Sequence, residues 1–263
     1  MKNRRSLKWL FIGTLVSVCF YSLPQGYASS ILIWPIDPVI EDDQNSASLW
    51  LENKDDKPVY MQIRVFEWKQ SDNDNQYTKQ TDIAVSPPFA LIEPGKRQLI
   101  RLIKNIKVQP NQERAYRIIV DEAPRAKKPD EITESSPASV GINFQMRYSV
   151  PLFVSGQGIW TNPDYSKNRD IQKATAPKLS YRVINQNNRR LLEVKNDGVV
   201  HARLSHITNA SGSGEKVLVE GLLGYVLAHS SMTLQLPTNQ INGSEKLQAL
   251  INNNPTPVVL EKR

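Results

Sequence analysis

The stretch SVGINFQMRYSVP, residues 139–151, decides the fold of this chain. Apolar and polar side chains alternate along it with a strict period of two, which is typical of a β-strand with one apolar and one polar face. The apolar or aromatic positions are Val140, Ile142, Phe144, Met146, Tyr148 and Val150. The polar stretch PRAKKPDEITESSPA, residues 124–138, precedes it and predicts a flexible arm that carries the strand. Such a strand either completes its own sheet or pairs with another protein.

Short strand-like runs separated by turn residues fill the rest of the first half, and helical periodicity is scarce. In residues 58–68, for example, Val59, Met61, Ile63 and Val65 share one face of a strand. The expected strands are 31–36, 46–53, 58–68, 88–94, 97–103, 115–123 and 139–150. Seven short strands in about 120 residues are typical of an immunoglobulin-like sandwich. The Cys–Trp–Cys pattern of antibody domains is missing, so strand number alone supports this interpretation.

The second half has the same character in a weaker form. The expected strands lie within 178–186, 189–197, 199–209, 215–231, 232–237, 245–253 and 256–262. GLLGYVLAHSS, residues 221–231, could be helical, but its two glycines and its Ser-Ser pair favour strand and turn. We expect a domain boundary near 152–158 and a polar loop at 162–178. The sequence therefore predicts an all-β protein with two domains, at 29–154 and 155–263.

Residues 1–28 have the pattern of an export signal. A basic start, an apolar run of about 15 residues and the small-x-small site Gly26-Tyr27-Ala28 predict cleavage near Ala28 rather than a membrane anchor. Cys19 lacks the small preceding residue of a lipoprotein site. The segment contains four basic residues and no acid, so its removal lowers the formal charge from +7 to +3 and removes the sole cysteine. The remaining basic residues are scattered among acids, which argues against nucleic-acid binding.

Catalytic and metal-binding patterns are missing from the sequence. His201, His206 and His229 lack the carboxylate and cysteine neighbours of a zinc site. No nucleophile elbow, phosphate-binding loop or dinucleotide fingerprint occurs. We therefore expect no enzyme activity, no metal and no cofactor, and no later segment that inserts into a membrane.

The motif SPPFALIEPGKRQLIRLI, residues 86–103, resembles the PapD-like periplasmic pilus chaperones. Their first domain has a Pro-Pro pair, then Leu-x-Pro-Gly, then a strand ending in Arg-Leu. Here the corresponding residues are Pro87-Pro88, Ile92, Pro94-Gly95 and Arg101-Leu102. The aromatic strand AYRIIVDEAP, the variable arm and the alternating strand follow in the same order as in the family. The resemblance covers roughly residues 46–154 and implies two immunoglobulin-like β-sandwich domains in an L-shaped arrangement.

Two departures from the family pattern concern the cations that hold the carboxylate of the bound pilin. The first strand has no basic residue, and the aligned position is near Asp37. Ser149 stands where the family has a lysine after the alternating run. Arg117 and Arg147 are therefore the nearest candidates for the carboxylate anchor, although each could also be an ordinary structural residue. Arg101, Pro94 and Gly95 are expected to be structural, with Arg101 tying strands or domains together.

The resemblance implies a chaperone that lends Val140, Ile142, Phe144 and Met146 to pilin subunits and delivers the subunits to an outer-membrane usher. The first-strand prolines, the relocated cation and the long arm resemble the archaic branch, whose subunits are spore-coat-U-like pilins. Two alternatives remain. The chain could be a pilus subunit or adhesin, or an exported sandwich that binds sugar or protein.

Overall fold

The computed structural model describes residues 31–123, 145–186, 189–210, 216–236, 246–252 and 254–263. The predicted export signal lies outside these residues, as do Val140, Ile142 and Phe144. Within the described ranges the regular structure is β-strand, apart from the 3-10 helices η3 (Tyr165–Lys167) and η4 (Ile171–Lys173). None of the helices in these ranges has the length and apolar character needed to cross a bilayer. The all-β prediction is confirmed.

The first sandwich consists of two facing sheets. One has the order β1-β3-β8-β6, and the other has the order β2-β10-β9-β4-β5, with β7 also paired to β4. Their bounds are β1 (Ile31–Trp34), β2 (Val39–Ile40), β3 (Ser46–Asn53), β4 (Val59–Ser71), β5 (Asp74–Thr78), β6 (Ile83–Ser86), β7 (Phe89–Ile92), β8 (Arg97–Lys104), β9 (Glu113–Glu122) and β10 (Arg147–Ser155). The pairs are antiparallel except β2 with β10, which are parallel.

Alternating side chains build the core of this sandwich. In β4, Val59, Met61 and Ile63 are buried, whereas Tyr60 and Arg64 are exposed. They pack against buried residues of the other strands, including Leu49, Leu51, Ile100, Leu102, Ile118, Val120 and Leu152. Burying each such aliphatic side chain contributes roughly 1.5–3 kcal/mol. The periodicity of residues 58–68 therefore predicted the inward face correctly.

The second sandwich has the sheet orders β15-β12-β11-β18 and β14-β13-β16-β17. Their bounds are β11 (Leu179–Gln186), β12 (Arg189–Asn196), β13 (Ala202–Asn209), β14 (Lys216–Val226), β15 (Ser230–Gln235), β16 (Leu247–Ile251), β17 (Val258–Val259) and β18 (Glu261–Lys262). Its core includes Tyr181, Val194, Leu204, Ile207, Val226 and Ala249. The stretch GLLGYVLAHSS forms the end of β14 and the turn into β15, as its glycines and serines indicated.

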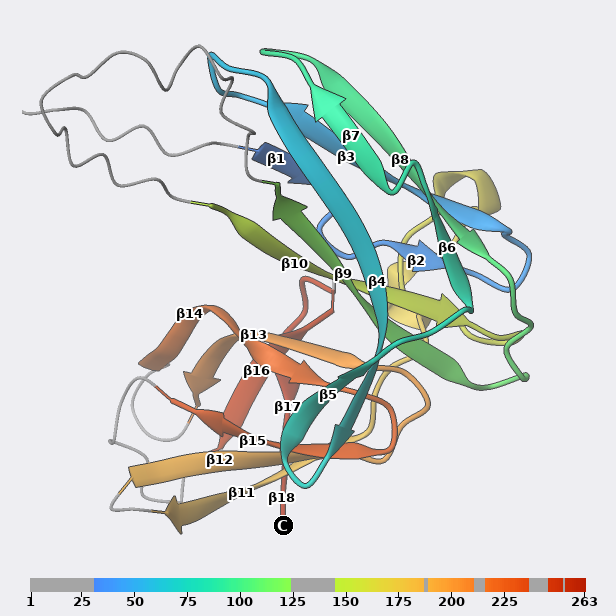
Figure 1. Ribbon diagram of the computed structural model, residues 1–263. Coiled ribbons are helices and arrows are strands. Elements are labelled where there is room, and N and C mark those ends of the chain that lie inside the picture. Colours follow the sequence, from blue (N-terminus) through green and yellow to red (C-terminus); the bar gives the residue numbers. More distant parts are fainter. Residues whose placement is uncertain (1–30, 124–144, 187–188, 211–215, 237–245, 253) are drawn as a thin grey trace, which may run out of the picture.

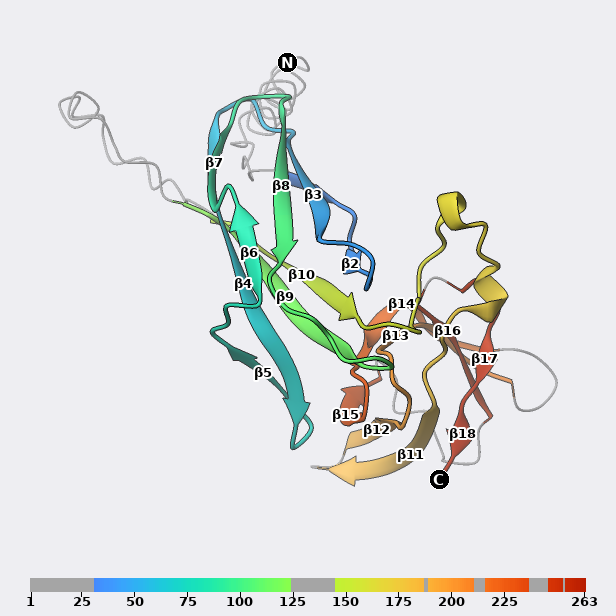
Figure 2. The same cartoon turned by 90° about the vertical axis from the view of Figure 1, so that its right-hand side faces the viewer.

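The two sandwiches meet at one end of β4, β9 and β10, so that they form an L (Figure 1 and Figure 2). A third apolar cluster fills this junction. Its buried members are Trp68, Phe153 and Leu227, with Val39, Ala115 and Tyr225 packed against them. Gln70 adds polar contacts, because its amide accepts from the Leu227 N–H at 2.8 Å and donates to the Tyr225 carbonyl at 3.0 Å.

The strands differ from expectation in two ways. The short strands β2, β5 and β6 were not predicted, since two to five residues leave little periodicity to detect. The alternating strand was expected to end at 150, but β10 continues to Ser155. Residues 150–155 are buried on both faces, because one face lies in the first core and the other faces the second sandwich. Burial on both faces removes the alternation that marked the preceding residues.

Candidate protein-binding site

The inward face of β10 extends past the core of its own sandwich. Val150, Leu152 and Val154 belong to the first core, and the partly buried Tyr148 packs against it. Met146 has the same parity and lies just before the strand, yet it is 36% exposed. Its backbone is still held, since the Glu122 N–H donates to its carbonyl at 3.0 Å. The apolar face therefore extends to a point where the described part of the chain no longer covers it.

One edge of β10 is open over most of its length. β9 pairs with the strand from Arg147 to Ser155, whereas β2 pairs with the opposite edge at Phe153 and Val154. The Glu122 N–H donates to the Met146 carbonyl, so the main-chain groups of the even-numbered residues point toward β9. Because the direction alternates along an antiparallel strand, the main-chain groups of the odd-numbered residues point toward the opposite edge. In agreement, the Phe153 N–H donates to the Pro38 carbonyl at 3.1 Å.

Arg147, Ser149 and Pro151 consequently present their main-chain groups along this edge, where the described residues supply no pairing strand. Pro151 lacks an N–H, but β9 loses no hydrogen bond because position 151 faces away from it. The Ile31 N–H, at the start of β1, donates to the Tyr148 hydroxyl of β10 at 3.2 Å. An added strand could extend the sheet here by β-augmentation.

Arg117 lies in the middle of β9, opposite Pro151, on the face that looks away from the core. Its guanidinium carbon lies 3.7 Å from the centre of the Trp68 ring and 5.1 Å from that of Tyr225. Its Nε atom is buried without a hydrogen-bond partner, and no carboxylate of the described ranges forms an ion pair with the side chain. Burial lowers the pKa of this guanidinium, and Tyr77 and Tyr225 offset the effect only in part.

Arginine stays protonated at neutral pH, so Arg117 is a partly buried cation without an anion in the described structure. A desolvated charge is costly unless it is paired and hydrogen-bonded. The site is therefore suited to a carboxylate that a binding partner brings, because a guanidinium can bind both carboxylate oxygens.

Arg147 has a different environment. It is 67% exposed and forms an ion pair with Asp121, which also binds Arg64 at 2.5 Å. Burial tends to raise the pKa of Asp121, but hydrogen bonds from Arg147 and Arg64 hold it below the ordinary value. Because this carboxylate already engages Arg147, the Arg147 guanidinium is less available to a partner than that of Arg117.

The remaining predicted residues lie outside this site. Arg101 is exposed on β8 between Ser48 and Ser86, and it forms no ion pair with any residue of the described ranges. Arg101 thus lies within one sheet of the first sandwich, on the strand that pairs with both β3 and β6. Pro94 and Gly95 form the β7–β8 turn, where Gly95 has φ 68° and the Lys96 N–H donates to the Glu93 carbonyl at 3.0 Å. This is the pattern of a type II turn, which favours Pro and Gly at these positions.

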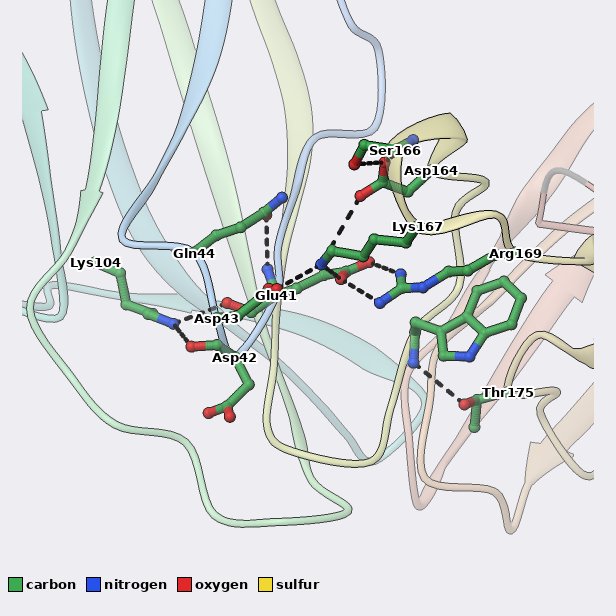
Figure 3. A network of polar contacts seen from close by, with 11 residues as sticks. Glu41, Asp42, Asp43, Gln44, Lys104, Asp164, Ser166, Lys167, Arg169 and Thr175 are labelled. Carbon is green, nitrogen blue, oxygen red and sulfur yellow. Dashed lines mark hydrogen bonds and ion pairs between the residues drawn. The ribbon is translucent and has the colours of Figure 1, made fainter.

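A polar network fixes β2 and thereby the point at which the open edge stops (Figure 3). Glu41 directly follows β2 and is buried. Its carboxylate accepts two hydrogen bonds from Arg169, at 2.5 and 2.8 Å, and one from Lys167 at 2.9 Å. Arg169 also lies over Trp160, with 4.9 Å between the guanidinium carbon and the ring centre. The connection between the two sandwiches, residues 156–178, is thus fastened to the first one.

Sequence reasoning missed the residues of the junction. Glu113 in β9 accepts from the His201 N–H at 2.7 Å, and both its oxygens lie within 3.0 Å of Nδ1 of that histidine. The His201 ring stacks on Phe153 with 3.4 Å between centres. His201 and Glu113 stand 88 positions apart, and no local pattern links them. The buried run at 150–155 was the one available signal, since a strand apolar on both faces needs two covering layers.

Comparisons with known proteins show the family to which the chain is similar. Residues 38–159 match the family described as Pili and flagellar-assembly chaperone, PapD N-terminal domain. A search of curated proteins gave no match. Among solved structures, the chain is similar to the CsuC–CsuE chaperone–tip adhesion subunit complex from the archaic chaperone–usher Csu pili of Acinetobacter baumannii. That match has 32% identity and a TM-score of 0.68, covering 89% of this chain and 99% of the other.

Two more distant structures support the fold alone. The Salmonella enterica SafB chaperone in complex with the SafA pilin has 17% identity and a TM-score of 0.58, covering 89% of this chain and 98% of the other. The E. coli chaperone DraB has 18% identity and a TM-score of 0.56, covering 89% and 97%. At 32% identity over nearly its full length, the chain belongs to the PapD-like family of pilus-assembly chaperones, in the archaic, Csu-type branch of the chaperone–usher pathway.

Proposed function

We propose that the chain captures pilus subunits by lending them the segment that leads into β10. One observation supports this above all. The apolar face of β10 continues by parity from Tyr148, which packs against the core, to the exposed Met146 just before the strand, and this strand has an open edge. A subunit with an incomplete sandwich has a complementary groove and an unpaired edge of its own.

In this mechanism Val140, Ile142, Phe144 and Met146 fill the subunit's groove while their main chain pairs with its edge. Four such side chains contribute on the order of 6–12 kcal/mol before the costs of ordering. A slip of one residue would turn all four away from the groove, so the pairing must be fixed in register. Complementation of this kind requires no nucleotide.

Arg117 is the proposed anchor for the subunit's terminal carboxylate, because its charge is partly buried and unmatched in the described structure. Arg147 is the second candidate, and its pairing with Asp121 favours a supporting role. A carboxylate held by a guanidinium contributes about 1.5–3 kcal/mol. Pro94, Gly95 and Arg101 would serve the scaffold.

The partners follow from the branch of the family. The similar CsuC chaperone forms a pre-assembly complex with a tip adhesion subunit. For this chain we propose spore-coat-U-like subunits as cargo and an outer-membrane usher as the recipient, where the next subunit displaces the lent strand. The chain would act in the periplasm after cleavage near Ala28, with domains at 29–154 and 155–263.

Co-expression with a spore-coat-U-like subunit encoded by a neighbouring gene tests this function. We expect a soluble one-to-one complex from the wild-type chain and loss of the subunit with Phe144→Asp, while the purified variant keeps its unfolding midpoint. Gln145→Asp is a matched control, since this exposed position has the opposite parity. An equal yield of subunit with Phe144→Asp would refute strand lending.

A further inference from the structure

A second cation lies beside the Arg117 site, and the second domain supplies it. Arg203 in β13 and Tyr225 in β14 are cross-strand partners, and such partners project from the same face of a sheet. Their neighbours along the two strands are buried in the second core: Ala202, Leu204 and Val226. By alternation, Arg203 and Tyr225 therefore point out of the second sandwich.

The outward face at Tyr225 is directed at the first sandwich. The ring of Tyr225 packs edge-on against Trp68, with 5.6 Å between centres, and lies 5.1 Å from the guanidinium carbon of Arg117. Trp68 covers one face of that guanidinium at 3.7 Å. A guanidinium whose face is stacked still has its in-plane N–H donors, so an incoming carboxylate would approach at its edge.

A hydrogen bond joins the Arg203 side chain to the Tyr225 hydroxyl, which places a second cation at the junction. Burial raises the pKa of Tyr225, while the positive charges of Arg203 and Arg117 lower it, and Asp37 acts in the opposite direction. Arg203 is half-buried beside this hydroxyl. Arg117 therefore lies over the ring of Tyr225 and Arg203 bonds to its hydroxyl, so two cations flank one tyrosine across the domain junction.

We propose that Arg203 is the second cation of the carboxylate site and that Tyr225 positions it beside Arg117. This inference rests on the proposed function, because it requires the subunit's C-terminus at Arg117. Each carboxylate oxygen would then receive donors from a different domain. Since the carboxylate bridges the junction, subunit binding and domain docking would stabilise one another reciprocally.

The test compares two forms of the spore-coat-U-like subunit that co-purifies with the chain, one ending in a carboxylate and one semisynthetic form ending in a carboxamide. We expect Arg203→Gln to weaken binding of the carboxylate form roughly 10- to 100-fold, as for the loss of one charge-assisted hydrogen bond, and to change binding of the carboxamide form less than about twofold. Arg203→Lys should recover part of the loss. Arg182→Gln is the control, since Arg182 is an exposed arginine of the same domain that pairs with Glu193.

Tyr225→Phe separates positioning from packing, because it keeps the ring and removes the hydroxyl. It should cost the carboxylate form at least about threefold without a shift in the unfolding midpoint of the free chain. If Arg203→Gln weakens binding of both forms of the subunit equally, or of neither, Arg203 is not the second cation of the carboxylate site. If in that case Arg117→Gln weakens binding of the carboxylate form but not of the carboxamide form, the proposed function stands without this inference. If Arg117→Gln also affects the two forms of the subunit equally, Arg117 is not the carboxylate anchor.

Discussion

Replacing Arg117 by methionine separates a binding residue from a structural one. The side chain of methionine is unbranched and apolar, so it can fill much of the space between Trp68 and Tyr225. The substitution removes a buried Nε atom that has no partner among the described residues, a defect that costs about 1–3 kcal/mol in the folded state. It also removes the cation–π contact with Trp68, which contributes up to about 2 kcal/mol when desolvated.

These two effects oppose each other, so the free energy of unfolding of the free chain should change by less than about 1 kcal/mol. Had Arg117 been one half of a buried ion pair, breaking the pair would cost about 3–5 kcal/mol. Subunit binding should respond differently and weaken by about 1.5–3 kcal/mol, roughly 10- to 150-fold, because the carboxylate loses its donor.

Chemical denaturation of the free variant and titration with purified subunit measure the two quantities independently. The diagnostic result is a variant of unchanged stability that binds poorly. A loss of more than about 2 kcal/mol in unfolding free energy with normal binding would refute the reasoning, since Arg117 would then be structural.

Three further predictions concern the strand, the junction and acid stability. Met146→Asp should leave the unfolding midpoint unchanged, because Met146 is 36% exposed. It should weaken subunit binding roughly tenfold or more, because an apolar anchor is lost. An equal effect of the control Gln145→Asp, at a position of opposite parity, would contradict the parity argument. Phe153→Ala should cost about 3–5 kcal/mol and expose the 156–178 connection to protease, because the ring is fully buried at the junction; an unchanged digestion pattern would show that the junction does not depend on this ring. Hydrogen bonds from Arg182 and Arg263 hold the pKa of Glu193 below 4.5 although burial opposes them, so its contribution to stability is present above pH 4.5 and is lost as the pH falls through the lowered value. Glu193→Gln should therefore flatten the dependence of the melting temperature on pH in that range, and a slope equal to that of the wild type would argue against this assignment.

The sequence contained enough to predict the strands whose two faces differ. The alternation in residues 58–68 predicts the buried side of β4, because each side chain there meets either core or water. The same holds for the start of β10. The family motif at 86–103 added the turn geometry of Pro94 and Gly95, since φ 68° is a conformation that glycine adopts readily.

The junction could not be predicted in the same way. Trp68, Phe153 and Tyr225 come from three distant parts of the chain, and each reads locally as an ordinary core residue. The environment of Arg117 depends on that junction, so the sequence could nominate this arginine only by eliminating other cations. Its burial beside Trp68 and its lack of an acid partner in the described residues are tertiary facts.

Two features of β10 together restrict how a partner strand can bind. β2 occupies the edge from Phe153 onward, so a partner strand must stop near Pro151, and Pro151 pairs with Arg117 on β9. The end of the free edge and the unmatched cation therefore coincide. A strand whose terminal carboxylate lies there must run parallel to β10, as β2 does. A slip of one residue would turn its anchors to the wrong face, and a slip of two would move the carboxylate about 6–7 Å from Arg117. The face to which the partner's side chains point and the position of its terminal carboxylate thus allow a single register. A bound strand that ran antiparallel to β10 would be incompatible with an anchor at Arg117.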